Sequence, residues 1–80
     1  MIDRIKEKKV VGIKQATKAI KSGIGNILYV AKDADFKLID SLVKIAVENN
    51  VEVRYIENMK ELGKLCGIDV AAAATVTIKE

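Results

Sequence analysis

The sequence predicts an α/β protein, a three-layer α/β/α sandwich around a four-stranded mixed sheet. Segments with helical and with strand periodicity alternate along the whole chain. The continuously apolar run Ile27–Ala31 is typical of a strand buried on both faces, which requires helices on both sides of the sheet. The 80 residues are expected to form a single domain, residues 1–80, and the half of them that are apolar suffice for one core.

The first third of the chain predicts two helices separated by a short strand. Residues 3–9 are expected to form a short, highly charged helix, and residues 10–13 a strand that leads into the next helix. That helix is predicted from Lys14 to Ser22, with Gly23 ending it. Its apolar positions lie three and four residues apart, at Ala16, Ala19 and Ile20. A turn at Gly25-Asn26 then precedes the buried strand.

A longer helix is predicted from Phe36 to Asn49. Asp33 and Asp35 precede it and are candidate N-cap residues, because a short carboxylate accepts hydrogen bonds from the first free backbone N–H groups of a helix. The pair Asn49-Asn50 can end the helix in a left-handed conformation. Ordinary capping is therefore the simplest role for the two aspartates.

The last third predicts a strand, a short helix and a final strand. Apolar and charged residues alternate from Val51 to Tyr55, which is strand periodicity. Asn58 and Glu61 have capping-box spacing before a short helix that Gly67 ends. Residues 72–78 predict the final strand, with Val76 and Ile78 on one face and threonines on the other.

Composition excludes several classes of protein. Histidine is absent, so the commonest general base and the commonest metal ligand are missing, and we expect no enzyme, no cofactor and no metal. The single cysteine, Cys66, is expected to pack in the core. The charged N-terminus MIDRIKEKK is unlike a signal peptide, and no apolar run is long enough for a transmembrane helix, so we expect a cytoplasmic protein.

Positive charge is concentrated at one end of the chain. Residues 1–25 hold seven Lys/Arg against two acidic residues, whereas residues 26–80 hold seven against nine. Such an asymmetry indicates an anionic partner that contacts one side of the fold.

The segment VVGIKQATKAIKSG carries this charge with no acidic residue. Lys14, Lys18 and Lys21 are spaced i, i+4, i+7 and so lie on one helix face, where like charges cost about 0.2–0.5 kcal/mol per pair unless a polyanion is bound. Gln15 can donate and accept, and Gly12 lets a ligand approach the helix start. The segment combines phosphate-neutralising and base-reading groups, although a lysine-rich face is often only solvated surface and this pattern does not separate RNA from DNA.

Four segments together resemble a known family. They are GIKQATKAIKSG (12–23), ILYVAKDAD (27–35), MKELGKLCGIDV (59–70) and AAAATVTI (71–78). The chain resembles the kink-turn-binding ribosomal-protein family, of the large-subunit "seven-Ae" and "thirty-e" type, and most closely its small bacterial YbxF-like branch. The resemblance covers nearly the whole chain and implies a three-layer α/β/α fold that grips a sharply bent RNA with tandem sheared G·A pairs.

The resemblance implies a first RNA contact at the helix start. The family's signature Gly-x-Asn-Glu-x-x-Lys reads here as Gly12-Ile13-Lys14-Gln15-Ala16-Thr17-Lys18. Lys14, Gln15 and Lys18 would face the G·A pairs, and Gly12 would allow close approach. Lys14 in place of Asn and Gln15 in place of Glu remove an acceptor carboxylate and add a cation.

The resemblance implies a second contact in the loop before the last strand. Ile68, Asp69, Val70 and Ala71 match this loop and would cover the nucleotide that is flipped out of the kink. Asp35 matches an acidic position that reads the same base. Ala71, and Phe36 directly after Asp35, stand where the family often has proline.

These observations predict a monomeric RNA-binding protein that recognises a kink-turn and holds it bent, with no covalent chemistry and no membrane partner. Two other readings remain open. A ribosome-associated structural protein would bind ribosomal RNA without preferring a kink. A small metabolite-binding module would need an apolar cleft away from the lysine segment.

Overall fold

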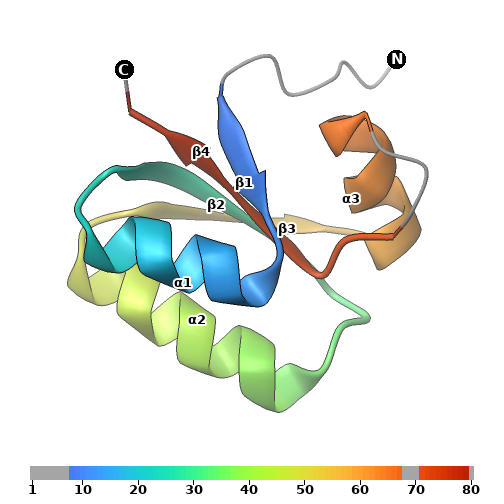
Figure 1. Ribbon diagram of the computed structural model, residues 1–80. Coiled ribbons are helices and arrows are strands. Elements are labelled where there is room, and N and C mark those ends of the chain that lie inside the picture. Colours follow the sequence, from blue (N-terminus) through green and yellow to red (C-terminus); the bar gives the residue numbers. More distant parts are fainter. Residues whose placement is uncertain (1–7, 68–70, 80) are drawn as a thin grey trace.

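Four strands form one mixed sheet in the order β1-β4-β2-β3 in the computed structural model, which describes residues 8–67 and 71–79 (Figure 1). The elements of this described part are β1 (Lys9–Val11), α1 (Ile13–Lys21), β2 (Gly25–Ala31), α2 (Phe36–Glu48), β3 (Glu52–Ile56), α3 (Met59–Cys66) and β4 (Ala74–Ile78). β2 and β3 run parallel, as expected for two strands joined by a helix, and β4 runs antiparallel to both β2 and β1. The predicted α/β class and mixed sheet are thus confirmed.

The helices lie on both faces of the sheet and create two cores. On one face α1 and α2 pack over Leu28 and Val30 of β2, both fully buried. On the other face α3 packs Leu62 against Ala31 and Ala72. β2 is therefore buried on both faces, as its continuous apolar run predicts.

The buried threonines of β4 each have a hydrogen-bonding partner on the α3 side. Thr75 Oγ1 lies 3.0 Å from the sulfur of Cys66, which is buried against α3 as the sequence predicts. Thr77 Oγ1 accepts from the Ile27 N–H at 2.9 Å, where the pairing of β2 with β4 shifts register. The hydroxyl satisfies a backbone donor that the irregular ladder leaves without a carbonyl.

Several predicted boundaries are wrong by a few residues. Ile13 belongs to α1 rather than to the first strand, because the positive-φ conformation of Gly12 (φ 108°) ends β1 at Val11, two residues before the predicted end. β2 already begins at Gly25, which pairs with Ile78 instead of forming a free turn. The helix predicted over 3–9 does not reach Lys9, which lies in β1, and residues 1–7 lie outside the described part.

The helix ends follow the predicted signals in most cases. Asp35 caps α2, Asn58 caps α3, and Asn50 (φ 59°) and Gly67 (φ 74°) take the left-handed conformation that follows a helix. Asp33 does not cap α2: its carboxylate accepts from the backbone N–H of Met59 instead. No helix in the described part of the chain has the length and apolar character needed to cross a bilayer.

Candidate nucleic-acid interface

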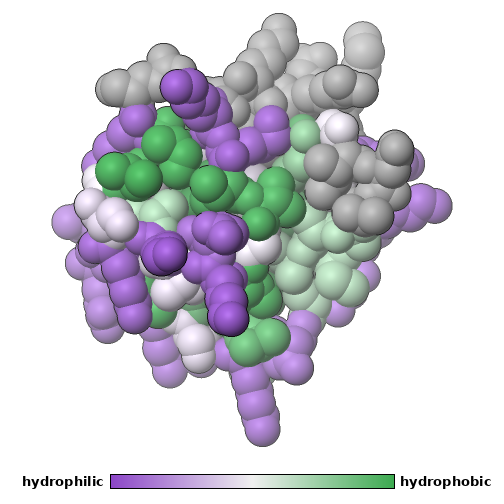
Figure 2. Space-filling model, viewed as in Figure 1, coloured by the Kyte–Doolittle hydropathy of each residue, from purple (hydrophilic) through white to green (hydrophobic). Residues whose placement is uncertain are grey.

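Helix α1 separates its apolar and polar side chains onto two faces. Ala16, Ala19 and Ile20 are buried against the sheet and α2. The solvent face carries the four polar side chains singled out in the sequence, Lys14, Gln15, Lys18 and Lys21, all exposed. Figure 2 shows hydrophilic side chains projecting from the α1 and α2 side of the molecule.

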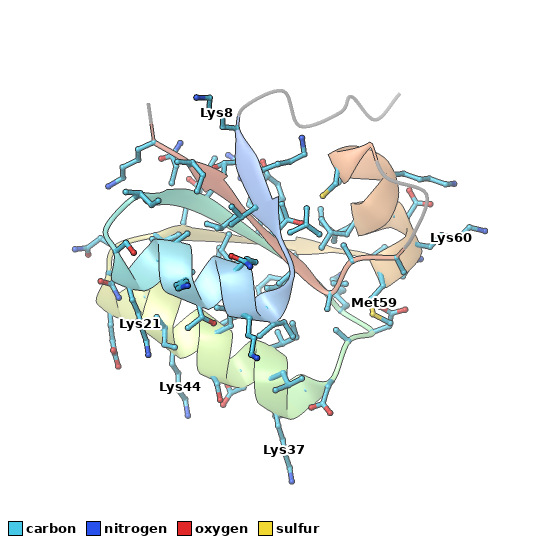
Figure 3. The ribbon with its side chains drawn as sticks, viewed as in Figure 1. Lys8, Lys21, Lys37, Lys44, Met59 and Lys60 are labelled. Carbon is cyan, nitrogen blue, oxygen red and sulfur yellow. The ribbon has the colours of Figure 1, made fainter. Side chains whose placement is uncertain are left out.

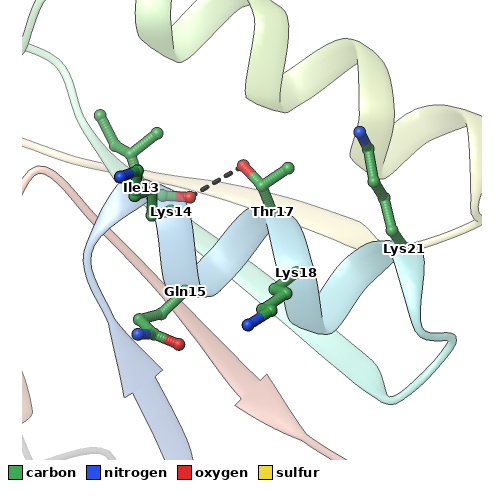
Figure 4. Close-up of a pocket in the computed structure, with 6 residues that line it drawn as sticks. All are labelled: Ile13, Lys14, Gln15, Thr17, Lys18 and Lys21. Carbon is green, nitrogen blue, oxygen red and sulfur yellow. Dashed lines mark hydrogen bonds between the residues drawn. The ribbon is translucent and has the colours of Figure 1, made fainter.

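The polar side chains of α1 border an open hollow of about 530 Å³ (Figure 4). Gln15 and Lys18 extend together to one side of the helix, while Thr17 and Lys21 extend to the other. Thr17 is held by a 2.8 Å hydrogen bond from its hydroxyl to the carbonyl of Ile13. An amide and an ammonium group therefore share one side of the helix, as paired contacts to a base edge require.

The start of α1 is open to an anion. Gly12 is the N-cap, with φ 108° and ψ 151°, and no side chain caps the helix. The backbone N–H groups of residues 13–15 consequently have no partner within the helix or from a capping side chain. Such N–H groups, at the positive end of the helix dipole, attract phosphate and carbonyl oxygens.

The lysines of α1 are not neutralised. In the described residues, Lys14, Lys18 and Lys21 form no ion pair, although they stand in a segment without acidic residues. Four cations elsewhere have acidic partners, Lys32 with Glu57, Lys44 with Asp40, Arg54 with Glu52 and Lys64 with Glu61, whereas Lys37, Lys60 and Lys79 form no ion pair within the described residues either. The hydrogen bond to Glu52 raises the pKa of Arg54. The α1 lysines have no such partner, so their positive charge remains available to an anion that approaches from solvent.

The segment before β4 lies beside the start of α1. The N–H of Gly12 donates to the carbonyl of Ala74 at 2.8 Å, and the N–H of Ala31 donates to the carbonyl of Ala73 at 3.0 Å. Ala71, the first described residue of this segment, is exposed. The predicted contacts Ile68, Asp69 and Val70 lie outside the described residues, so only Ala71 of that loop is placed by the structure.

Asp35 follows β2 at the same edge of the sheet. Its Oδ1 accepts from the N–H groups of Lys37 (2.9 Å) and Leu38 (3.3 Å), so the exposed carboxylate is fixed at the start of α2. Because β2 ends where β4 begins, the start of α1, the start of α2 and the entry to β4 meet at one edge (Figure 1). The structure thus brings Gly12, Asp35 and the entry to β4 to a common edge, while Ala71 lies three residues before β4, next to Ala72, which bonds Met59 of α3.

The sequence matches a known protein family over nearly its whole length. Residues 3–80 match the ribosomal protein L7Ae/L30e/S12e/Gadd45 family. The chain belongs to this family. An RNA-binding protein of a Geobacillus species is 46% identical over 72 residues, which cover 90% of this chain and 88% of the relative. The RNA-binding protein YbxF of Geobacillus stearothermophilus is 42% identical over 70 residues, covering 88% and 85%. The predicted family and its YbxF-like branch are therefore confirmed.

A solved structure shares the L7Ae-type fold. The 15.5kD RNA-binding protein of Giardia lamblia superposes with a TM-score of 0.85 at 22% identity, covering 91% of this chain and 62% of that protein. At this identity the likeness concerns the fold alone. The three proteins compared here are each named for RNA binding, and none is named as an enzyme.

Two features of the structure were not predicted from the sequence: a second hollow beside α2 and a long-range hydrogen bond of Asp33. Phe36 and Tyr55 are 79% and 56% exposed and border a second hollow of about 190 Å³ between α2 and β3. Lys32, Asp40 and apolar side chains complete its lining, which contains no nucleophile paired with a base. Asp33 bonds to α3 across 26 residues of sequence, and no local pattern signals such a contact.

The conformation of Gly12 makes a direct prediction. A Cβ atom added there meets nothing within 4 Å, so the cost of Gly12→Ala arises from backbone strain, about 1–3 kcal/mol in this glycine-only region. The methyl group would also obstruct close approach to the helix start. We expect thermal unfolding to show the loss of stability and RNA titration to show weaker binding.

Gly23→Ala is the matched control for this substitution. Gly23 lies at the other end of α1, also has positive φ (81°) and also has open space around an added Cβ. It should lose about 1–2 kcal/mol of stability while RNA affinity stays unchanged. Equal losses of affinity in the two variants would contradict a special role for the helix start.

Proposed function

We propose that this chain binds RNA through the exposed face of α1 and selects kink-turn RNA, a bent element with tandem sheared G·A pairs. The observation that carries the proposal is the open start of α1 with three lysines that lack ion-pair partners in the described residues. Membership of the L7Ae family, whose relatives above are named RNA-binding proteins, supports RNA as the anion.

The two kinds of group on α1 have different tasks. The lysine ammonium groups neutralise phosphates. The resulting attraction weakens as the salt concentration rises and does not depend on the RNA sequence. Gln15 and Lys18, which extend to the same side of α1, supply donors and an acceptor for base edges. Regular A-form RNA hides its base edges in a deep, narrow groove, whereas sheared G·A pairs widen it, so these groups favour the kinked form.

The proposal extends to the neighbouring segments. Ile68, Asp69, Val70 and Ala71 would cover the nucleotide flipped out of the kink, and Asp35 would contact its base. The position of Asp35 and of the entry to β4 at the edge that also holds Gly12 supports this arrangement. One copy carries all of these contacts, so we propose that a cytoplasmic monomer binds, to ribosomal RNA or to another kinked RNA.

Binding would hold the RNA bent by population shift. A kink-turn exchanges between extended and bent forms, and a protein that contacts the bent form more favourably increases its population by its differential affinity. No bond is made or broken. The RNA's bent fraction, followed by energy transfer between labels on its two arms, should rise as protein is added.

A gel-shift titration tests the proposal. The probe is a kink-turn RNA, and the control is the same RNA with both G·A pairs replaced by Watson–Crick pairs, at fixed salt. We expect about tenfold or greater weakening for the control RNA, because at least one base-edge contact worth about 1–3 kcal/mol is lost. Equal binding of both RNAs would favour a ribosomal RNA-binding protein without kink preference, and no binding of either would reject RNA as the partner.

A further inference from the structure

We propose that Asp33 is a positioning residue for RNA recognition: its carboxylate holds Met59, and through Met59 the segment Ala71–Ala73, in the place where the RNA is read. This inference rests on the proposed function. It assigns a role to a side chain that does not itself belong to the α1 face or to the loop before β4.

The carboxylate of Asp33 makes a long-range hydrogen bond. Asp33 follows β2, and its Oδ1 accepts from the backbone N–H of Met59 at 2.8 Å. Met59 is the first residue of α3, so its N–H has no carbonyl partner within the helix. Figure 3 places Met59 where α3 begins, beside the chain leading from β2 into α2. Asp33 therefore joins the β2–α2 connection to the start of α3.

Met59 passes this constraint to the segment before β4. Its carbonyl accepts from the N–H of Ala72 at 3.1 Å, next to the exposed Ala71. The carbonyl of Ala73 accepts from Ala31, and that of Ala74 from Gly12. The segment is thus held by backbone groups of α3, β2 and the α1 cap, three elements that meet at the proposed interface.

Asp33 contributes the one side-chain hydrogen bond of this arrangement in the described residues. The other bonds join backbone groups, which a change of side chain does not remove. The Lys32–Glu57 ion pair (3.7 Å) bridges the same two connections, but both side chains are exposed and the pair is screened by solvent. Asp33, itself exposed, is the side chain that hydrogen-bonds Met59, so the position of Met59 and Ala72 depends on this bond together with the packing of Leu62 on Ala72.

Electrostatics and positioning predict opposite signs for the loss of Asp33. Removing a carboxylate adds one positive charge to the protein, so charge alone predicts tighter binding of every RNA. Loss of the hydrogen bond releases Met59 and Ala72 and predicts weaker binding of the kinked RNA in particular. The ratio of the affinities for kink-turn RNA and its Watson–Crick control separates the two effects, because the added charge changes both affinities alike.

The experiment measures this ratio for the full chain and four variants. Asp33→Ala removes the acceptor, Asp33→Glu keeps the charge but displaces the acceptor, and Asp33→Asn keeps an Oδ1 acceptor without the charge. Asp40→Ala is the matched control, a half-exposed α2 carboxylate that pairs with Lys44. We expect the ratio to fall about three- to tenfold in Asp33→Ala and Asp33→Glu and to stay within about twofold in Asp33→Asn and Asp40→Ala.

Amide hydrogen exchange supplies a second readout. Exchange at Met59 and Ala72 should accelerate in Asp33→Ala and Asp33→Glu but not in Asp33→Asn, while core amides of β2 stay protected. If Asp33→Ala does not fold, Asp33→Glu and Asp33→Asn decide the question. If the negative charge of Asp33 were required, Asp33→Asn would behave like Asp33→Ala. Wild-type behaviour of Asp33→Asn therefore indicates that the hydrogen-bond acceptor is what matters.

The outcomes separate this inference from the proposed function. A wild-type ratio in Asp33→Ala and Asp33→Glu, while Lys18→Ala still loses affinity, overturns the role of Asp33 and leaves the proposed function standing. A wild-type protein that does not discriminate the two RNAs overturns both. A fall in Asp33→Ala and Asp33→Asn but not in Asp33→Glu, with Asp40→Ala unchanged, would indicate that the charge acts directly and would reject positioning through Met59.

Discussion

Lys18→Ala is expected to weaken binding of a kink-turn RNA by about ten- to a hundredfold, because a lysine that donates to a base edge contributes about 1–3 kcal/mol of recognition. Lys18 is exposed, extends to the same side of α1 as Gln15, and forms no ion pair in the described residues. No compensating interaction within the protein is lost. Titration at fixed salt, followed by gel shift or fluorescence anisotropy, measures the change.

Lys64→Ala is the control for this substitution. Lys64 lies on α3, on the opposite face of the sheet, and its partly exposed pair with Glu61, 3.7 Å long, contributes little stability. The two variants lose the same charge, so a general electrostatic effect would weaken binding equally in both. We expect Lys64→Ala to bind nearly as tightly as the wild type. An unchanged dissociation constant for Lys18→Ala would reject its role at the interface.

Much of the fold follows from local patterns in the sequence. The continuous apolar run of β2 predicts a strand with helices on both sides, and Leu28, Val30 and Ala31 are indeed fully buried. The boundaries are less predictable because they depend on backbone conformation. Val10, Val11 and Ile13 have strand-like composition, but the positive φ of Gly12 redirects the chain and places Ile13 in α1.

The proposed interface also has features that can be predicted from local sequence and features that cannot. The spacing of Lys14, Lys18 and Lys21 predicts that all three are exposed on α1, and they are, because helical periodicity is local. Their side chains nevertheless diverge, since Lys18 extends to the side of Gln15 and Lys21 to the side of Thr17. The bond from Asp33 to Met59 spans 26 residues and depends on how α3 packs on the sheet. The exposure of Tyr55 likewise depends on β3 lying at the sheet edge, so neither could be predicted from local sequence.

Leu62→Ala is expected to cost about 3 kcal/mol of unfolding free energy, within the range for buried Leu→Ala substitutions. Leu62 is the largest buried side chain in the core between α3 and the sheet, where Met59 and Leu65 of α3 are only partly buried. The other buried members of this core, Ala31, Cys66 and Ala72, are small, so they cannot expand to fill the cavity. For a domain of 80 residues, the loss corresponds to about 12–24 °C in Tm.

Leu38→Ala makes the same chemical change on α2, where Leu38 is half exposed. Less apolar surface returns to water there and no cavity forms, so its Tm should fall much less. Because Met59 of α3 holds Ala72, loosening α3 by Leu62→Ala should also reduce the preference for kinked over Watson–Crick RNA at temperatures where the protein remains folded. Equal Tm values for the two variants would show that α3 contributes little to stability, and an unaltered preference would show that recognition does not depend on the docking of α3.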